Sequence, residues 1–283
     1  MGADSASRRQ FKKLLRPLFS DATYSVIQAA AKAWDIQRGE WSEPELDLIH
    51  YAVQSGDTAL DIGANFGLYA YPLAKAVGPN GKVYAFEPIP FTARTFRLVA
   101  KILRFGDRVE LIEKGCGEQA DWIDFALPVT EVGTVSTGVV HMASRNNNRP
   151  GRQQHSKYDT PQTVRCEVIR LDDFLPQLRS LSFVKCDIEG ADLFAMRGAK
   201  RLIEEHHPTV VIEINPWFLE GFGLQVEELV HYFTDMGYAL YRYVRGALIP
   251  SRTEDIEEDN WVFVHPSRAE RMRPLLSHRL STR

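Results

Sequence analysis

The stretch that decides the fold is 58-TALDIGANFG-67, in which five residues suited to a buried strand lead into a turn that contains two glycines. Thr58–Ile62 is expected to be a strand, and a helix is expected from Gly67 to Val77. The tetrapeptide Gly78-Pro79-Asn80-Gly81 that follows is typical of a sharp turn. A strand, a glycine turn, a helix and a second turn together indicate one unit of an α/β protein.

The same alternation continues along most of the chain. Further strands are expected at residues 82–87, 109–112, 181–186, 209–214, 238–243 and 261–264, and helices at 90–104, 191–204 and 226–236. Apolar strands separated by helices predict a doubly wound, mostly parallel sheet with helices on both faces. Residues 1–55 are expected to form an N-terminal helical extension, and residues 56–283 the α/β domain.

An insertion at about 121–163 breaks this alternation. Residues 122–127 and 134–140 alternate like antiparallel strands, and the polar tract 144–160, between them and residues 164–168, is expected to be a mobile loop. Hydroxyl groups and basic side chains in this insertion suit a polyhydroxylated or anionic ligand, although a solvated loop would have the same composition. His141 is a candidate base in this region.

The composition is that of an ordinary globular protein, with 44% hydrophobic residues, 25% charged residues and a formal net charge of −3. This charge argues against a nucleic-acid partner. No apolar run approaches the ~18 residues of a membrane span, although a basic amphipathic helix at 11–19 could touch an anionic surface. Cys116, Cys166 and Cys186 lack metal-motif spacing and fit reduced thiols in a soluble, cytoplasmic protein.

Acidic side chains follow the predicted strands where ligands of open α/β sheets bind. The glycines in Asp61–Gly67 have GxxxG spacing rather than the GxGxxG of dinucleotide-binding folds, which favours a cofactor without phosphates. Glu87 follows Gly67 by 20 positions, the separation at which an acidic residue binds ribose in dinucleotide folds. Trp41 and the segment 43–45 either cover this crevice as a lid or only begin a helix.

Two later strand ends carry further oxygen ligands. Asp187 and Glu189 lie in 185-KCDIEGA-191, where Asp187 is the better candidate base and Glu189 also suits the start of a helix. Glu213 and Asn215 are expected on one face of their strand. Asp187, Glu213 and Asn215 could bind a divalent metal such as Mg²⁺, or form an acceptor pocket without metal, which is the interpretation we favour.

Four segments together resemble the FkbM family of methyltransferases: Thr58–Gly67, Val83–Pro88, Val184–Ala191 and Pro208–Glu213. The resemblance extends over roughly residues 45–245. It implies a class I methyltransferase fold, which is Rossmann-like and doubly wound with a seven-stranded, mostly parallel sheet. It also implies S-adenosylmethionine as the methyl donor and O-methylation, often of sugar or polyketide hydroxyls.

The resemblance also assigns roles by position. It implies that the methionine part of the cofactor is surrounded by Asp61, Gly63, Asn65 and Gly67, that Glu87 holds the ribose, and that Gly115 and Cys116 lie near the adenine. Asp187 and Glu189 match the Asp-x-Glu-Gly motif of the family. The expected function is therefore O-methylation of a small polyhydroxylated acceptor such as a sugar, a glycoconjugate or a polyketide-like molecule. The alternatives are an NAD-dependent oxidoreductase and a catalytically silent α/β binding module.

Overall fold

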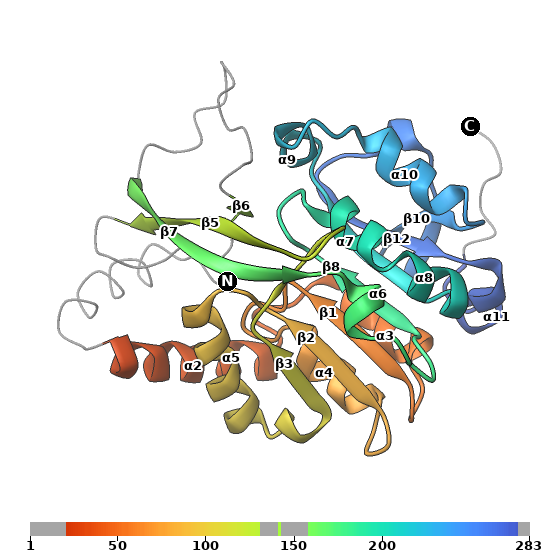
Figure 1. The fold of residues 1–283 in the computed structure, drawn as a ribbon. Coiled ribbons are helices and arrows are strands. Elements are labelled where there is room, and N and C mark those ends of the chain that lie inside the picture. Colours follow the sequence, from red (N-terminus) through yellow and green to blue (C-terminus); the bar gives the residue numbers. More distant parts are fainter. Residues whose placement is uncertain (1–20, 131–140, 143–157, 277–283) are drawn as a thin grey trace.

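The computed structural model describes residues 21–130, 141–142 and 158–276. Its main sheet has eight strands in the order β11-β10-β12-β9-β8-β1-β2-β3 (Figure 1). Their bounds are β1 Thr58–Ile62, β2 Lys82–Phe86, β3 Val109–Ile112, β8 Phe183–Cys186, β9 Thr209–Ile214, β10 Ala239–Val244, β11 Ala247–Pro250 and β12 Asp259–Val264. The five strands from β3 to β9 are parallel, and β12 and β11 run antiparallel to their neighbours. This topology confirms the predicted class I methyltransferase fold.

Helices cover both faces of this sheet. One face carries α2 Asp21–Arg38, α3 Leu48–Ala52, α4 Ala70–Ala76, α5 Pro90–Leu103 and α11 Ala269–Met272. The other carries α6 Leu171–Phe174, α7 Asp192–Gly198, α8 Lys200–His206, α9 Pro216–Gly221 and α10 Val226–Thr234. Side chains of β1 alternate between the two cores, Ala59 in the first and Leu60 and Ile62 in the second. This is why the predicted strands are apolar on both faces.

The winding reverses at the centre of the sheet. β1 pairs with β2 on one side and with β8, from much later in the chain, on the other. The carboxyl ends of these three strands therefore meet at the point where the connections depart in opposite directions. In open α/β sheets this is where a crevice for ligands forms.

The insertion and the short strand β4 before it form a second sheet in the order β4-β7-β5-β6, which extends away from the main sheet (Figure 1). Its strands are β4 Gly115–Cys116, β5 Asp121–Thr130, β6 His141–Met142 and β7 Tyr158–Ile169. The expected strand at 134–140 and nearly all of the expected loop at 144–160 lie outside the described residues, as does the expected helix at 11–19. Because β7 begins at Tyr158, the last residues assigned to that loop belong to a strand.

Two expectations about the main fold are wrong. The sheet has eight strands rather than seven, because Arg245 and Gly246 adopt positive φ values of 50° and 84° and turn the chain back into β11. The helix expected at 191–204 is two helices that meet at Ala199. Just before this break Gly198 packs so closely on the backbone of Gly117 that a Cβ atom there would overlap its carbonyl oxygen.

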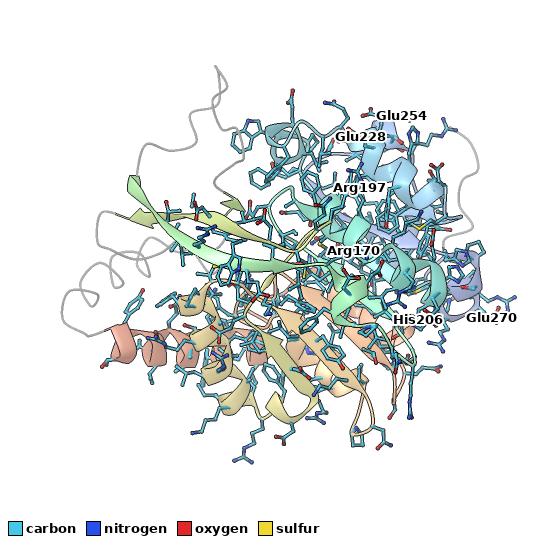
Figure 2. All side chains as sticks on the ribbon, in the orientation of Figure 1. Arg170, Arg197, His206, Glu228, Glu254 and Glu270 are labelled. Carbon is cyan, nitrogen blue, oxygen red and sulfur yellow. The ribbon has the colours of Figure 1, made fainter. Side chains whose placement is uncertain are left out.

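Ion pairs link outer helices of the fold to neighbouring segments (Figure 2). Arg197 on α7 lies 3.6 Å, nitrogen to oxygen, from Glu228 on α10 and at the same distance from Glu118. His206 ends α8 just before β9 and so lies at the amino end of that strand, away from the crevice. No helix in the described ranges is both long and apolar enough to cross a membrane.

Candidate active site

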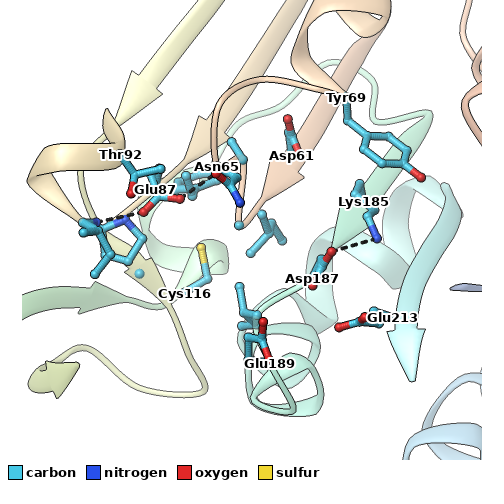
Figure 3. Close-up of a pocket in the computed structure, with 18 of the residues that line it drawn as sticks. Asp61, Asn65, Tyr69, Glu87, Thr92, Cys116, Lys185, Asp187, Glu189 and Glu213 are labelled. Carbon is cyan, nitrogen blue, oxygen red and sulfur yellow. Dashed lines mark hydrogen bonds and ion pairs between the residues drawn. The ribbon is translucent and has the colours of Figure 1, made fainter. Parts of the chain in front are cut away.

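A pocket opens at the carboxyl ends of β1, β2 and β8 (Figure 3). It brings together most of the residues singled out from the sequence: Asp61, Gly63, Asn65, Glu87, Gly115, Cys116, Asp187, Glu189 and Glu213. Glu87 and Cys116 lie toward one end, and Asp187 and Glu213 lie toward the other. The pocket thus joins sequence positions more than a hundred residues apart into one site.

Glu87 is almost completely buried and is held by the backbone around it. Its Oε2 accepts a hydrogen bond from the backbone N–H of Asn65 at 3.1 Å, and its Oε1 accepts one from the N–H of Ile89 at 2.9 Å. Burial raises the pKa of Glu87 to about 7, although these two hydrogen bonds oppose the rise. Asn65 adopts a left-handed conformation, with φ at 47°, which turns its N–H toward this carboxylate.

Polar atoms without partners lie at the same end of the pocket. The Oδ1 of Asn65 and the Oγ1 of Thr92 are buried and have no hydrogen-bond partner within the described part of the chain. Thr92 is only 2% exposed and lines the pocket near Glu87. Buried polar groups are normally paired, so these atoms indicate a place where a polar ligand binds. Thr92 could not be recognised from the sequence, because a threonine in the first turn of a helix is unremarkable.

Asp61 lies between the two ends of the pocket and is 2% exposed. The backbone N–H of Ala70 donates to its carboxylate, but its Oδ2 has no partner among the residues described. Burial raises the pKa of Asp61 to about 7, against the opposing effect of Lys185. A buried carboxylate oxygen of this kind is suited to a cationic or hydrogen-bond-donating ligand.

Lys185 organises the opposite end of the pocket and is itself 2% exposed. Its Nζ donates to the Oδ1 of Asn260 at 2.7 Å and lies 3.4 Å from the Oδ2 of Asp187. Burial alone would lower the pKa of Lys185, but the carboxylates of Asp187 and Glu43 reverse this and raise it. The ammonium therefore stays charged and holds Asp187 at the edge of the pocket.

Asp187 and Glu213 form a carboxyl pair next to this lysine. Burial, together with the charges of Asp187 and Glu189, raises the pKa of Glu213 to about 9, and a hydrogen bond joins its side chain to Asp187. Burial and these charges thus favour the protonated form of Glu213, whose side chain is hydrogen-bonded to Asp187.

The loop after β8 is held by Asp192, which was not among the residues expected at the site. Asp192 is 1% exposed, and its carboxylate accepts from the N–H groups of Ile188 at 3.2 Å and Gly190 at 3.1 Å. These bonds fix the turn in which Glu189 takes a left-handed conformation, with φ at 58°. An aspartate two residues after the glycine of 187-DIEG-190 is the feature that could have revealed this role.

Two of the proposed site residues, Gly67 and Asn215, are not brought into the pocket. Gly67 lies behind it, packed against the rings of Phe96 and Phe105. Asn215 caps α9 through its Oδ1, which accepts from the N–H groups of Trp217 at 3.0 Å and Phe218 at 3.3 Å. For His141 only the backbone is described, within β6.

The metal set Asp187, Glu213 and Asn215 is therefore not assembled, because the oxygen of Asn215 is occupied at the start of a helix. Among the described residues, no group of three or more His, Cys, Asp or Glu side chains is arranged to hold a metal ion. The site uses its carboxylates in hydrogen bonds with one another and with the backbone.

Glu213→Gln is expected to raise the melting temperature at pH 8 by at least about 2–4 °C, the shift that corresponds to ~1 kcal/mol. The folded protein keeps a proton on Glu213 that the unfolded chain releases above its ordinary pKa of 4.5. The resulting loss of folding stability grows from pH 4.5 to about pH 9. Glutamine removes this loss and can still donate to Asp187. Calorimetry should show the gain at pH 8 and almost none at pH 5. Glu110→Gln, on an exposed side chain, is the control and should not reproduce this pH dependence.

The chain is similar to proteins of a known family. The model of the methyltransferase FkbM domain matches residues 61–240. "Methyltransferase 1" of Beauveria bassiana (strain ARSEF 2860) is 26% identical over 166 residues, which cover 55% of this chain and 63% of that relative. "Methyltransferase sdnD" of Sordaria araneosa is 23% identical over 206 residues, which cover 65% and 74%.

A similar solved structure is methyltransferase FkbM from Methylobacillus flagellatus KT, with 18% identity and a TM-score of 0.44. The match covers 79% of this chain and 50% of that one. A methyltransferase from Aquifex aeolicus described as SAM-dependent is 15% identical, with a TM-score of 0.40, over 82% of this chain and 97% of that one. The chain thus spans less than two thirds of the Beauveria relative and half of the Methylobacillus chain.

Proposed function

This chain belongs to the FkbM methyltransferase family, and we propose that it transfers a methyl group from S-adenosylmethionine to a hydroxyl of a small polyhydroxylated acceptor. The observation that carries the proposal is the buried, unpartnered Oδ2 of Asp61 in the same pocket as Glu87 and Asp187. A carboxylate in this position needs a cation or a donor, and the cofactor has an ammonium group.

The residues of the pocket fit S-adenosylmethionine, which carries an ammonium, a sulfonium and ribose hydroxyls but no phosphate. Asp61 would accept from the ammonium, and Glu87 would accept from the ribose hydroxyls with the lone pairs that the backbone leaves free. Thr92 and Cys116 would lie at the adenosine end. When bound, the cofactor supplies an activated methyl group on its sulfonium.

Asp187 is the proposed base. It lies at the carboxyl end of β8, and its half-buried side chain faces the pocket beside Lys185. Deprotonating the acceptor hydroxyl as the methyl group is transferred would make the oxygen a better nucleophile. Lys185, whose Nζ lies 3.4 Å from the Oδ2 of Asp187, holds this carboxylate at the edge of the pocket. Glu189 lines the pocket beside this pair and would help to orient the acceptor.

Calorimetric titration of the purified chain with S-adenosylmethionine and, separately, with NAD⁺ tests the proposal. Binding of S-adenosylmethionine without NAD⁺ binding is the expected result, followed by release of S-adenosylhomocysteine when a panel of hydroxylated acceptors is added. Binding of NAD⁺ alone would instead support the oxidoreductase. A folded protein that binds neither compound would support a silent binding module.

Glu87→Gln is expected to raise the dissociation constant for S-adenosylmethionine about 10–100-fold, because hydrogen bonds to a charged acceptor contribute ~1.5–3 kcal/mol. S-adenosylhomocysteine has the same ribose and should lose as much affinity. Both constants can be measured by calorimetry, with Glu110→Gln on β3 as a control that leaves them unchanged. Unaltered affinity in a folded Glu87→Gln variant would remove Glu87 from the cofactor site.

A further inference from the structure

One wall of the pocket is built by residues outside the matched family domain. Trp41 and Glu43 line the pocket from the segment before β1. The Oε2 of Glu43 accepts from the hydroxyl of Tyr69 at 2.7 Å and from the Nδ2 of Asn260 at 3.0 Å. Asn260 in turn accepts from Lys185 at 2.7 Å. These bonds fix the segment against the end of the pocket that holds Asp187.

Trp41 is held in place by contacts to both Lys32 and Phe66. The ammonium of Lys32 lies 3.9 Å from the centre of its indole ring, and the ring of Phe66 meets it edge-on at 6.4 Å between centroids. A fixed, half-buried indole is a broad apolar surface with little conformational entropy to lose on binding. It is suited to packing against the apolar face of a ring that is otherwise hydroxylated.

The charges around the pocket restrict what such a ring can carry. Six carboxyl side chains line it: Glu43, Asp61, Glu87, Asp187, Glu189 and Glu213. The cations that line it within the described ranges are Lys114 and Lys185, and each already has a carboxylate, Glu167 at 2.7 Å and Asp187 at 3.4 Å. Glu213 favours its protonated form, whereas the carboxylates among the other five accept hydrogen bonds and repel anions. The residues that line the described pocket therefore offer acceptors to donor groups and no unpaired cation to a phosphate or a carboxylate, and the ammonium of Lys32 lies against the ring of Trp41 and does not line the pocket.

We propose that Trp41 and Glu43 form an acceptor subsite that takes an uncharged or amine-bearing hydroxylated ring and rejects a phosphorylated or carboxylated one. The subsite rests on the proposed function, because it places the acceptor next to Asp187. It differs from the expectation drawn from the insertion, whose basic residues suit an anionic acceptor. It also assigns acceptor choice to a segment that precedes the matched domain.

The test uses the full chain loaded with S-adenosylhomocysteine and labelled with ¹⁵N at tryptophan. The indole N–H signal of Trp41, assigned with Trp41→Phe, is followed by nuclear magnetic resonance while methyl glucoside, glucosamine or glucuronate is added at one pH and ionic strength. The signal of Trp34, which is 56% exposed and does not line the pocket, is the internal control.

Saturable shifts of the Trp41 signal with methyl glucoside and glucosamine are expected, with glucuronate about tenfold weaker or without effect. Glu43→Gln should reduce the preference for glucosamine over glucuronate. The proposal is overturned if glucuronate binds as tightly as the neutral sugar, or if none of the three sugars moves the signal. Calorimetry of S-adenosylhomocysteine binding distinguishes failure of the subsite from failure of the proposed function. A chain that binds S-adenosylhomocysteine but no sugar refutes the subsite alone. A chain that does not bind S-adenosylhomocysteine refutes the proposed function.

Discussion

Asp187→Asn is expected to lower turnover by roughly 10²–10⁴-fold, the usual contribution of a positioned side-chain base. Asparagine keeps the size of the side chain and can still contact Lys185 and Glu213, but it cannot take the proton of the acceptor hydroxyl. Lys185 keeps its hydrogen bond to Asn260, so we expect the pocket to stay assembled. The measurement is the rate of S-adenosylhomocysteine release with an acceptor found in the screen, together with the affinity for S-adenosylmethionine.

The affinity for the cofactor should change little, because the proposed cofactor contacts are Asp61 and Glu87. Asp173→Asn is the matched control, since that side chain is 71% exposed and pairs with Arg170 on the surface. It should leave both turnover and affinity as they are. Near-normal turnover in Asp187→Asn, with the cofactor still bound, would show that another group removes the proton.

Much of the fold could be predicted from the sequence because local pattern and tertiary structure agree in the central strands. β1, β3 and β9 have the expected bounds, since each is an apolar run closed by turn or helix residues. The expectation of a seven-stranded sheet failed at β11, a four-residue strand in a hairpin. Its Arg245-Gly246 turn is a weak pattern, and a short edge strand carries little hydrophobic periodicity.

The residues of the site also differ in how well the local sequence predicts them. Asp61, Glu87 and Asp187 could be predicted because each follows a recognisable strand. Asn215 was placed with Glu213 by the two-residue period of a strand, but β9 ends at Ile214 and Asn215 begins a helix. The period therefore no longer applied. Boundaries between elements are where such reasoning is weakest.

Residues that act on the site from elsewhere in the fold could not be predicted. Asn260 lies in β12, some 75 positions after the lysine that it holds, and only the order of strands in the sheet brings the two together. Nothing in the spacing of Asn260 relates it to a site, because the relation is created by the pairing of β12 with β9. Tyr69, just before α4, contacts Glu43 from 26 positions away, and the spacing of these two residues gives no sign of it either.

Gly63→Ala is expected to lower the free energy of unfolding by about 2–4 kcal/mol. Gly63 has a φ of 82°, where an L side chain is strained, and its Cβ would overlap the carbonyl oxygen of Asp187. The family resemblance placed this glycine around the methionine part of the cofactor. The structure gives a second reason for it, the close packing of the turn after β1 on the turn after β8. Urea unfolding at equilibrium measures the loss.

Gly246→Ala separates the two causes, because Gly246 has nearly the same φ, 84°, and has no atom within 4 Å of a Cβ added there. It should cost only the ~1–2 kcal/mol of the conformation. The additional loss of stability in Gly63→Ala is caused by the overlap with Asp187. To relieve this overlap, the turn that contains Asn65 must move away from the turn that contains Asp187. Cofactor affinity should therefore fall in Gly63→Ala and stay unchanged in Gly246→Ala. Equal losses of stability in the two variants would mean that the two turns can separate freely, and that the cofactor and acceptor ends of the pocket are not held in register by this contact.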